Sequence, residues 1–244
     1  MADRHGPCCR TRDILGVVTR SSRPSAAEAL RIGGFALLVI SLLLSGCKNC
    51  SPTAPAIFKL SGRLLLHGTL RDTTGTPTGA RIVDNADSVR VYLLRAGSVV
   101  DSTRTVGGAY TFTGLPNGTY RALARLLPGI ADTTTAATIS NGDLAMPERL
   151  DLQPAGTLTA SPNPFAGSVR INFSISSSGV VHVRVVSVAG SPIKLLTDST
   201  LVVGQYSFDW DGTDDVGLPV AAGAYWGLFT QGSDNRAELV FRVP

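Results

Sequence analysis

Four aspartates in the C-terminal third are the side chains whose type and spacing come nearest to a metal site: Asp209, Asp211, Asp214 and Asp215. Oxygen-rich loops bind calcium when acidic ligands fall at fixed offsets around a glycine and a bidentate acid closes the loop. With Gly212 at the sixth position of such a loop, Ser207 falls on the first and Leu218 on the twelfth, so both outer ligands are missing. We therefore expect no metal here, but a turn in which aspartate side chains accept backbone N–H bonds.

Histidines are the other side chains that could do chemistry, as general acids or bases. After residue 46 the chain contains two, His67 and His182, and each lies in an alternating segment away from any motif. The sequence contains no HExxH zinc motif, no GxSxG nucleophile turn and no phosphate-binding glycine loop. This pattern predicts a protein that is not an enzyme and that needs no cofactor.

Cys47 and Cys50 form a CxxC pair, a spacing that serves redox chemistry or, with a following histidine, haem attachment. Ser51 stands in the place of that histidine, and no βαβ pattern surrounds the pair. Cys8 and Cys9 complete the set of four cysteines. Because no cysteine follows Cys50, we expect disulfides to play no part in the folded domains.

An apolar run from Ile32 to Leu44 follows Arg31 and has the length of a signal-peptide core, whereas a spanning helix needs roughly 20 apolar residues. The ending Leu44-Ser45-Gly46-Cys47 resembles the bacterial lipobox. That resemblance implies cleavage before Cys47, whose thiol carries diacylglycerol, so that Cys47 becomes the first residue of the mature chain. Lys48 is not the aspartate associated with inner-membrane retention, which favours the outer membrane or cell surface.

The charge of the chain is unevenly distributed between the leader and the remainder. The whole sequence has a net charge of +4, but residues 1–46 contain six arginines and three acidic residues, leaving 16 basic and 15 acidic residues after them. The remainder is close to neutral, so it lacks the basic footprint of a nucleic-acid-binding protein. The positive leader is typical of an export signal.

After a polar tether at residues 47–57, short alternating segments are separated by turn clusters, which predicts an all-β protein of two tandem β-sandwiches. The strands expected in the first sandwich are Gly62–Leu70, Ser88–Arg95, Val99–Thr105, Ala109–Thr113, Thr119–Leu126, Thr133–Ile139 and Glu148–Leu152. Residues 71–79, RDTTGTPTG, are expected to form a loop. No sustained helical period occurs outside the leader.

The strings RDTTGTPTGA (71–80) and GAYTFTGLPNGTY (108–120) resemble the carboxypeptidase regulatory-like and Cna-B-like domains. The resemblance spans residues 58–153 and implies a prealbumin-like sandwich that serves as a spacer, an adhesin stalk or a carbohydrate-contacting surface. If it contacts glycan, we expect an exposed aromatic platform formed by Tyr92, Tyr110 or Tyr120.

Residues 158–244 alternate with period two, so that each strand is expected to bury one side. The shared faces are Val169, Ile171, Phe173 and Ile175; Val181, Val183 and Val185; Tyr206, Phe208 and Trp210; and Leu239, Phe241 and Val243. By the same rule one of Tyr225 and Trp226 is core and only the other can be exposed.

The segments SPNPF (161–165), WDGTDDVGLPVAAGAY (210–225) and RAELVFRV (236–243) resemble the Ig-like domain of the flagellar hook-capping protein FlgD and the C-terminal sorting domains of type IX secretion substrates. This resemblance implies an export, sorting or assembly role for the last domain.

These patterns together predict a non-catalytic lipoprotein of the bacterial cell envelope with a structural, adhesive or export-sorting role. Its expected partners are the membrane, through the lipid, and secretion machinery or surface glycan; nucleic acid is not expected. Two alternatives remain open. One is a carbohydrate-binding surface module, and the other is a type IX secretion cargo that is cut in the linker at residues 153–160. The sequence does not identify a ligand or an oligomeric state.

Overall fold

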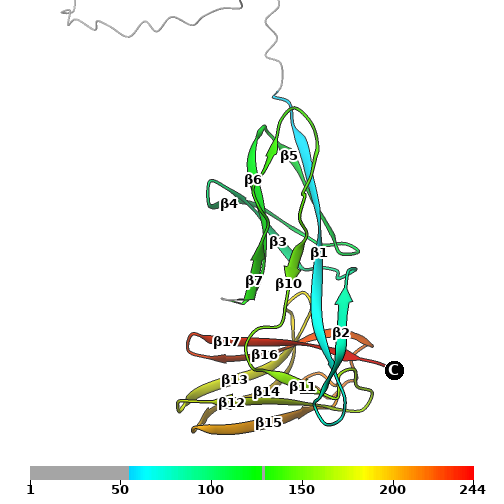
Figure 1. Cartoon of the computed structure of the whole chain (residues 1–244), viewed down its shortest axis with the longest axis vertical. Coiled ribbons are helices and arrows are strands. Elements are labelled where there is room, and N and C mark those ends of the chain that lie inside the picture. Colours follow the sequence, from blue (N-terminus) through cyan, green and yellow to red (C-terminus); the bar gives the residue numbers. More distant parts are fainter. Residues whose placement is uncertain (1–54, 128–129) are drawn as a thin grey trace, which may run out of the picture. The chain divides into compact units, whose positions relative to one another are not determined.

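The computed structural model describes residues 55–127 and 130–244, and all regular structure in these residues is β-strand, which confirms the predicted all-β class (Figure 1). The strands up to residue 152 are β1(Phe58–Arg71), β2(Pro77–Val83), β3(Arg90–Arg95), β4(Ser98–Arg104), β5(Ala109–Leu115), β6(Gly118–Leu127), β7(Ile130–Thr133), β8(Ala137–Ile139), β9(Leu144–Ala145) and β10(Leu150–Leu152). Those that follow are β11(Thr159–Ser161), β12(Val169–Ile175), β13(Gly179–Ser187), β14(Pro192–Leu201), β15(Gly204–Trp210), β16(Gly223–Gln231) and β17(Asp234–Arg242).

Two sheets pack together in the N-terminal part. In one, the long strand β1 pairs antiparallel with β5 through its first half and with β2 through its second half, and parallel with β9 and β10. The other has the order β4-β3-β6-β7, with β8 pairing with β6. The C-terminal part also has two sheets, of order β11-β12-β15 and β14-β13-β16-β17.

Strand β2 is the main difference from the predicted strands, because residues 77–79 were expected to lie in a loop and no strand was predicted over the rest of it. Six of its seven residues are exposed and Val83 is half-buried, so the segment has no apolar alternation to reveal it. Its pairing with β1 is made by backbone groups, which every residue except proline carries in full. The expected strand Thr133–Ile139 is also divided, into β7 and β8, by the irregular residues 134–136.

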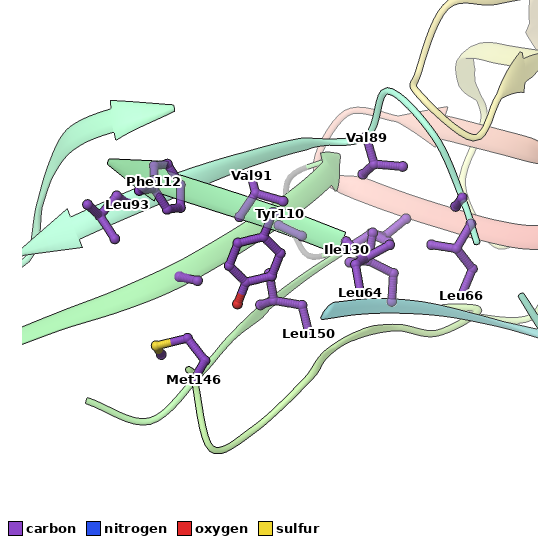
Figure 2. Packing of buried hydrophobic residues seen from close by; sticks show 14 of the residues in the cluster. Leu64, Leu66, Val89, Val91, Leu93, Tyr110, Phe112, Ile130, Met146 and Leu150 are labelled. Atoms are coloured by element: carbon purple, nitrogen blue, oxygen red, sulfur yellow. The ribbon is translucent and has the colours of Figure 1, made fainter. Parts of the chain in front are cut away.

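The inward faces of the first two sheets form one hydrophobic cluster. Figure 2 shows part of it, with the Tyr110 ring among Val91, Leu150 and Met146. Val91 and Leu150 are fully buried, as is Leu64 of β1. Apolar burial, at about 25 cal/mol per Å², is therefore the main stabilising contribution in this part of the chain.

Strands β16 and β17 are buried on both faces, which corrects the prediction that each strand buries one side. Every residue from Tyr225 to Phe229 and from Ala237 to Phe241 is buried. The two faces belong to different clusters. Tyr225, Phe229 and Val240 pack in the C-terminal core. Trp226, Leu228, Leu239 and Phe241 join the cluster of the N-terminal sheets. The two pairs of sheets thus share one cluster of buried apolar side chains.

Gly68 is the point at which β1 approaches β17 most closely. A Cβ atom at this position would lie 2.6 Å from a ring carbon of Phe241 and 3.1 Å from the Cβ of Leu239. The Phe241 ring is itself buried, with the Arg81 guanidinium 4.8 Å from its centroid. A side chain at position 68 would therefore force the two strands apart.

We expect Gly68→Ala to lower the free energy of unfolding by about 1–3 kcal/mol, the usual cost of inserting a methyl group into a packed interface. Urea denaturation followed by tryptophan fluorescence measures the change. Gly142→Ala is the matched control, because no atom lies within 4 Å of the Cβ it would add. Equal stability of the two variants would contradict the close approach.

Candidate functional site

The predicted lipidation site, Cys47, and the lipobox residues Leu44, Ser45 and Gly46 lie outside the described residues. No helix in the described part of the chain is long and apolar enough to cross a membrane.

We call the segment with Asp209, Asp211, Asp214 and Asp215 the acidic turn. Each of these aspartates has its own hydrogen-bonding partners. Asp209 forms a two-pronged ion pair with Arg170, in which Nε lies 2.8 Å from Oδ1 and Nη2 lies 3.0 Å from Oδ2. The Oδ1 of Asp211 accepts hydrogen bonds from the backbone N–H and the hydroxyl of Thr213. The Thr213 hydroxyl contributes most to holding the pKa of Asp211 below its usual range.

The other two aspartates cap backbone groups. Asp214 accepts hydrogen bonds from the N–H groups of Val216 and Leu218, at 3.0 and 2.9 Å. Asp215 accepts one from the N–H of Leu195 in β14. These bonds confirm the expectation of turn-capping aspartates. Within residues 55–127 and 130–244, no three His, Cys, Asp or Glu side chains come together as a metal ligand set.

The two histidines lie in different sheets, and each faces one carboxylate on a neighbouring strand. His67 Nε2 in β1 is 2.9 Å from Asp151 in β10, and His182 Nδ1 in β13 is 2.9 Å from Asp198 in β14. Both are partly exposed cross-strand pairs, an arrangement that stabilises sheets. The structure does not bring the two histidines together.

The aromatic platform expected on the first sandwich is wrong for two of its three tyrosines. Tyr110 and Tyr120 are only 1% and 2% exposed. Burial raises the pKa of Tyr110, and the Tyr120 hydroxyl donates to the Pro116 carbonyl. Tyr92 is half-buried on the opposite face of its sheet. The alternating pattern correctly placed the three tyrosines on strands. Which face of each strand is covered by the other sheet depends on the packing of the sheets, which the sequence does not show.

The pair Tyr225 and Trp226 is also corrected, because both residues are buried. Tyr225 packs edge-on against Trp210 in the C-terminal core. Trp226, on the other face of β16, belongs to the cluster of the N-terminal sheets. The rule that adjacent strand residues point to opposite sides holds, but here both sides are covered.

Asn163, which lies between Pro162 and Pro164, connects three parts of the chain and is fully buried. Its backbone N–H and C=O pair with those of Arg71 at the end of β1, at 2.8 and 2.7 Å. Its side-chain NH₂ donates to the carbonyls of Thr69 and Leu239, each at 2.8 Å. Its side-chain oxygen accepts from the N–H of Phe241 at 2.8 Å. We call this arrangement the Asn163 joint.

The Asn163 joint completes the coverage of the free edge of β17. Ala155 exchanges two backbone hydrogen bonds with Ala237, and Phe165 accepts from Val243 and donates to the Phe241 carbonyl. Between these two contacts, the Asn163 side-chain amide donates to the Leu239 carbonyl and accepts from the Phe241 N–H, as a peptide group of a neighbouring strand would. An unpaired strand edge is a site of unwanted association, and this one is covered from Ala237 to Val243.

The sequence pointed to SPNPF only through a family resemblance and did not predict the role of Asn163. The one available signal was an amide side chain between two residues that have no N–H group. The apolar run at residues 225–229 also carried a signal, because continuous apolar runs are typical of strands buried on both faces.

We expect Asn163→Ala to lower the free energy of unfolding by about 2–5 kcal/mol, because it leaves several buried backbone groups without partners. Asn163→Asp keeps the shape but removes the two donors, so we expect a loss of similar size. Urea denaturation measures both. The control is Asn172→Ala, whose side chain makes one 3.4 Å contact with the Arg170 carbonyl. If Asn163→Asp were as stable as the natural chain, the joint would not depend on its hydrogen bonds.

Glu238 is a buried carboxylate in β17, 3% exposed, and its Oε1 has no hydrogen-bond partner in the described residues. Burial raises its pKa to about 7, although the positive charge of Arg71 acts in the opposite direction. The folded protein therefore holds this proton at pH values where an exposed glutamate has lost it.

Because the folded pKa of Glu238 is raised, its protonated form favours folding at low pH. We expect stability to fall as pH rises from about 4.5 to about 7, by up to about 3 kcal/mol from this group. Glu238→Gln should flatten this part of the profile, whereas Glu148→Gln, at an exposed position, should not. Urea midpoints from pH 4 to 8 measure the slope. An unchanged slope in Glu238→Gln would contradict the assignment.

Comparisons with known proteins give no family for this chain. No family model matches it, and no curated protein matches it. Among solved structures, it is similar to a DUF3823 family protein from Parabacteroides merdae at 15% identity and a TM-score of 0.34, covering 78% of this chain and 100% of that one. It is also similar to a candidate carbohydrate-binding protein from Bacteroides uniformis at 10% identity and a TM-score of 0.34, covering 74% and 98%.

A third similar structure is dimeric latent PorU from Porphyromonas gingivalis, at 13% identity and a TM-score of 0.29, covering 72% of this chain and 19% of that one. Similarity at this level does not assign a function to the chain.

Proposed function

We propose that this chain is a non-catalytic lipoprotein of the bacterial cell envelope, acylated on Cys47, whose two pairs of β-sheets form a structural module outside the cell membrane. The leader supports this proposal through the apolar run and the Leu44–Cys47 motif. The acidic turn and the two histidines also fit it, because their side chains are engaged in turn capping and in cross-strand pairs.

The observation that carries the structural role is the hydrophobic cluster shared by the two pairs of sheets. Trp226, Leu239 and Phe241 of the C-terminal part are buried together with Leu64 and Leu66 of β1. The Asn163 joint adds three hydrogen bonds across this contact, two with the Arg71 backbone and one to the Thr69 carbonyl. A large apolar interface resists the relative domain motion that is usual between linked domains. Such a module suits a spacer or scaffold that holds a fixed form.

The contacts of the predicted linker argue against a cargo that is cut at residues 153–160. Ala155 is paired with Ala237 in both directions, and Leu158 and Ala160 are buried. A protease would have to open this segment first, because cleavage needs an exposed, extended backbone. We therefore favour a C-terminal domain that remains attached.

Glycan binding remains a second candidate function, but fewer tyrosines are available for it than the sequence indicated. Tyr110 and Tyr120 are in the core, so Tyr92 is the remaining candidate ring of the three. Aromatic platforms bind sugars through an open ring face. One half-buried ring is a weak platform by this measure.

We expect the mature protein to incorporate radiolabelled palmitate and its intact mass to correspond to a chain that begins at acylated Cys47. Cys47→Ser should abolish labelling because it removes the acceptor sulfur. Cys50→Ser, three residues later, is the control and should label normally. Equal labelling of Cys47→Ser and the natural chain, or a mature N-terminus at another residue, would overturn the proposal.

A further inference from the structure

The outer face of the sheet β4-β3-β6-β7 gathers four exposed arginines. In β3, Val91 and Leu93 are fully buried in the core, so Arg90, Tyr92 and Leu94 point to the other side. In β6, the core residues are Tyr120, Ala122 and Ala124, which turns Arg121, Leu123 and Arg125 outward. From β4, Arg104 lies opposite Arg90 and Val99 lies opposite Leu94. Leu123 itself is buried. We call the surface made of Arg90, Arg104, Arg121, Arg125, Tyr92, Leu94 and Val99 the arginine face.

The positive charge of the arginine face is not balanced by neighbouring carboxylates. None of its four arginines forms an ion pair within the described residues, and Arg104 donates to a neutral carbonyl, that of Ser88. The carboxylates on these strands turn away. Asp101 lies opposite the inward-facing Leu93, and Asp132 lies opposite Ala124 and accepts a hydrogen bond from Asp151.

Arg90 and Arg104 are directly opposed on adjacent strands. Like charges in this position destabilise a sheet. Repulsion between these arginines lowers the stability of the sheet. An anionic partner that lies across the surface would offset this repulsion.

Apolar side chains lie between the arginines. Tyr92 and Leu94 are half-buried, and Val99 is 57% exposed on the β3–β4 hairpin. A soluble anion would gain little from this apolar strip. A lipid bilayer offers both phosphate groups, which arginine binds in a two-pronged manner, and an apolar layer just beneath them.

The position of the arginine face relative to the tether also favours a membrane. Cys47 lies eleven residues before Phe58, so an acylated chain places the start of β1 within about 40 Å of the bilayer. Phe58 pairs with Leu115, and β6 begins three residues later at Gly118. Arg121 is three residues further along β6. The tether therefore lets this face reach the bilayer surface.

We propose that the arginine face lies against the anionic phospholipid surface of the membrane in which the lipid anchor of Cys47 is inserted. This inference rests on the proposed lipid anchor for its geometry. The contact would orient the module against the bilayer surface, with the first pair of sheets close to the headgroups.

The test uses the mature chain from residue 47 with Cys47→Ser, which carries no lipid, so vesicle binding reports on the face alone. We expect co-sedimentation with phosphatidylglycerol–phosphatidylethanolamine vesicles and none with phosphatidylcholine vesicles. Binding should be lost at 0.5 M salt, because surface charge is screened over a few ångströms there. Arg121→Gln/Arg125→Gln should weaken binding roughly twentyfold or more, about fivefold for each charge removed.

The matched control is Arg149→Gln/Arg184→Gln, which removes the same charge from exposed or half-exposed positions outside the arginine face. Its binding should equal that of the parent chain, and circular dichroism should show that both double variants are folded. Equal loss in the two variants, equal binding to neutral vesicles, or full competition by a soluble acidic polysaccharide would each overturn this inference. Absence of palmitate on Cys47 would overturn the lipid anchor instead, and the vesicle result would still be interpretable.

Discussion

The side-chain amide of Asn163 makes the contact on which the arrangement of the sheets depends. A carboxamide offers the same donor and acceptor as a peptide group, and here it occupies the place of one beside β17. Its second N–H reaches the Thr69 carbonyl in β1, and its backbone pairs with Arg71. One residue thus satisfies buried polar groups on two strands that lie far apart in the sequence. Leaving such groups unpaired would cost more than the bonds contribute.

The coverage of β17 has consequences for packing on both of its faces. With its edge closed by Ala155, Asn163 and Phe165, β17 can be buried on each side without exposing backbone groups. One face then contributes Val240 to the C-terminal core, and the other contributes Phe241 to the interface with β1. This double burial explains why β1 has glycine at position 68, where a methyl group would meet the Phe241 ring. The interface between the two pairs of sheets depends on the close approach of the β1 and β17 backbones as well as on apolar side chains.

The charged groups divide into two kinds with different physical roles. The aspartates near residue 211 hold turn backbone and Arg170, so their charge is used within the fold. Glu238 is buried, and its raised pKa reflects the cost of desolvating a carboxylate. The arginines on β3, β4 and β6 instead face solvent, with no ion pair in the described part of the chain. Residues 47–244 are nearly neutral, with 16 basic and 15 acidic residues, and uneven placement of these charges creates a surface that net charge alone does not reveal.

The sequence by itself determined the class of the fold and the strands that alternate. Val169, Ile171, Phe173 and Ile175 are all buried, as period two required, because the pleat of a strand is a local property. The turn capping by Asp211 and Asp214 was also predictable, since their partners lie two to four residues away. Strand β2 was not, because its exposed side chains carry no pattern and its pairing uses backbone alone. Only the tertiary structure decided that Tyr110 points inward, that Trp226 is covered and that Asn163 binds β1 and β17. Each of these depends on groups brought together from distant parts of the chain, a relation that local periodicity does not contain.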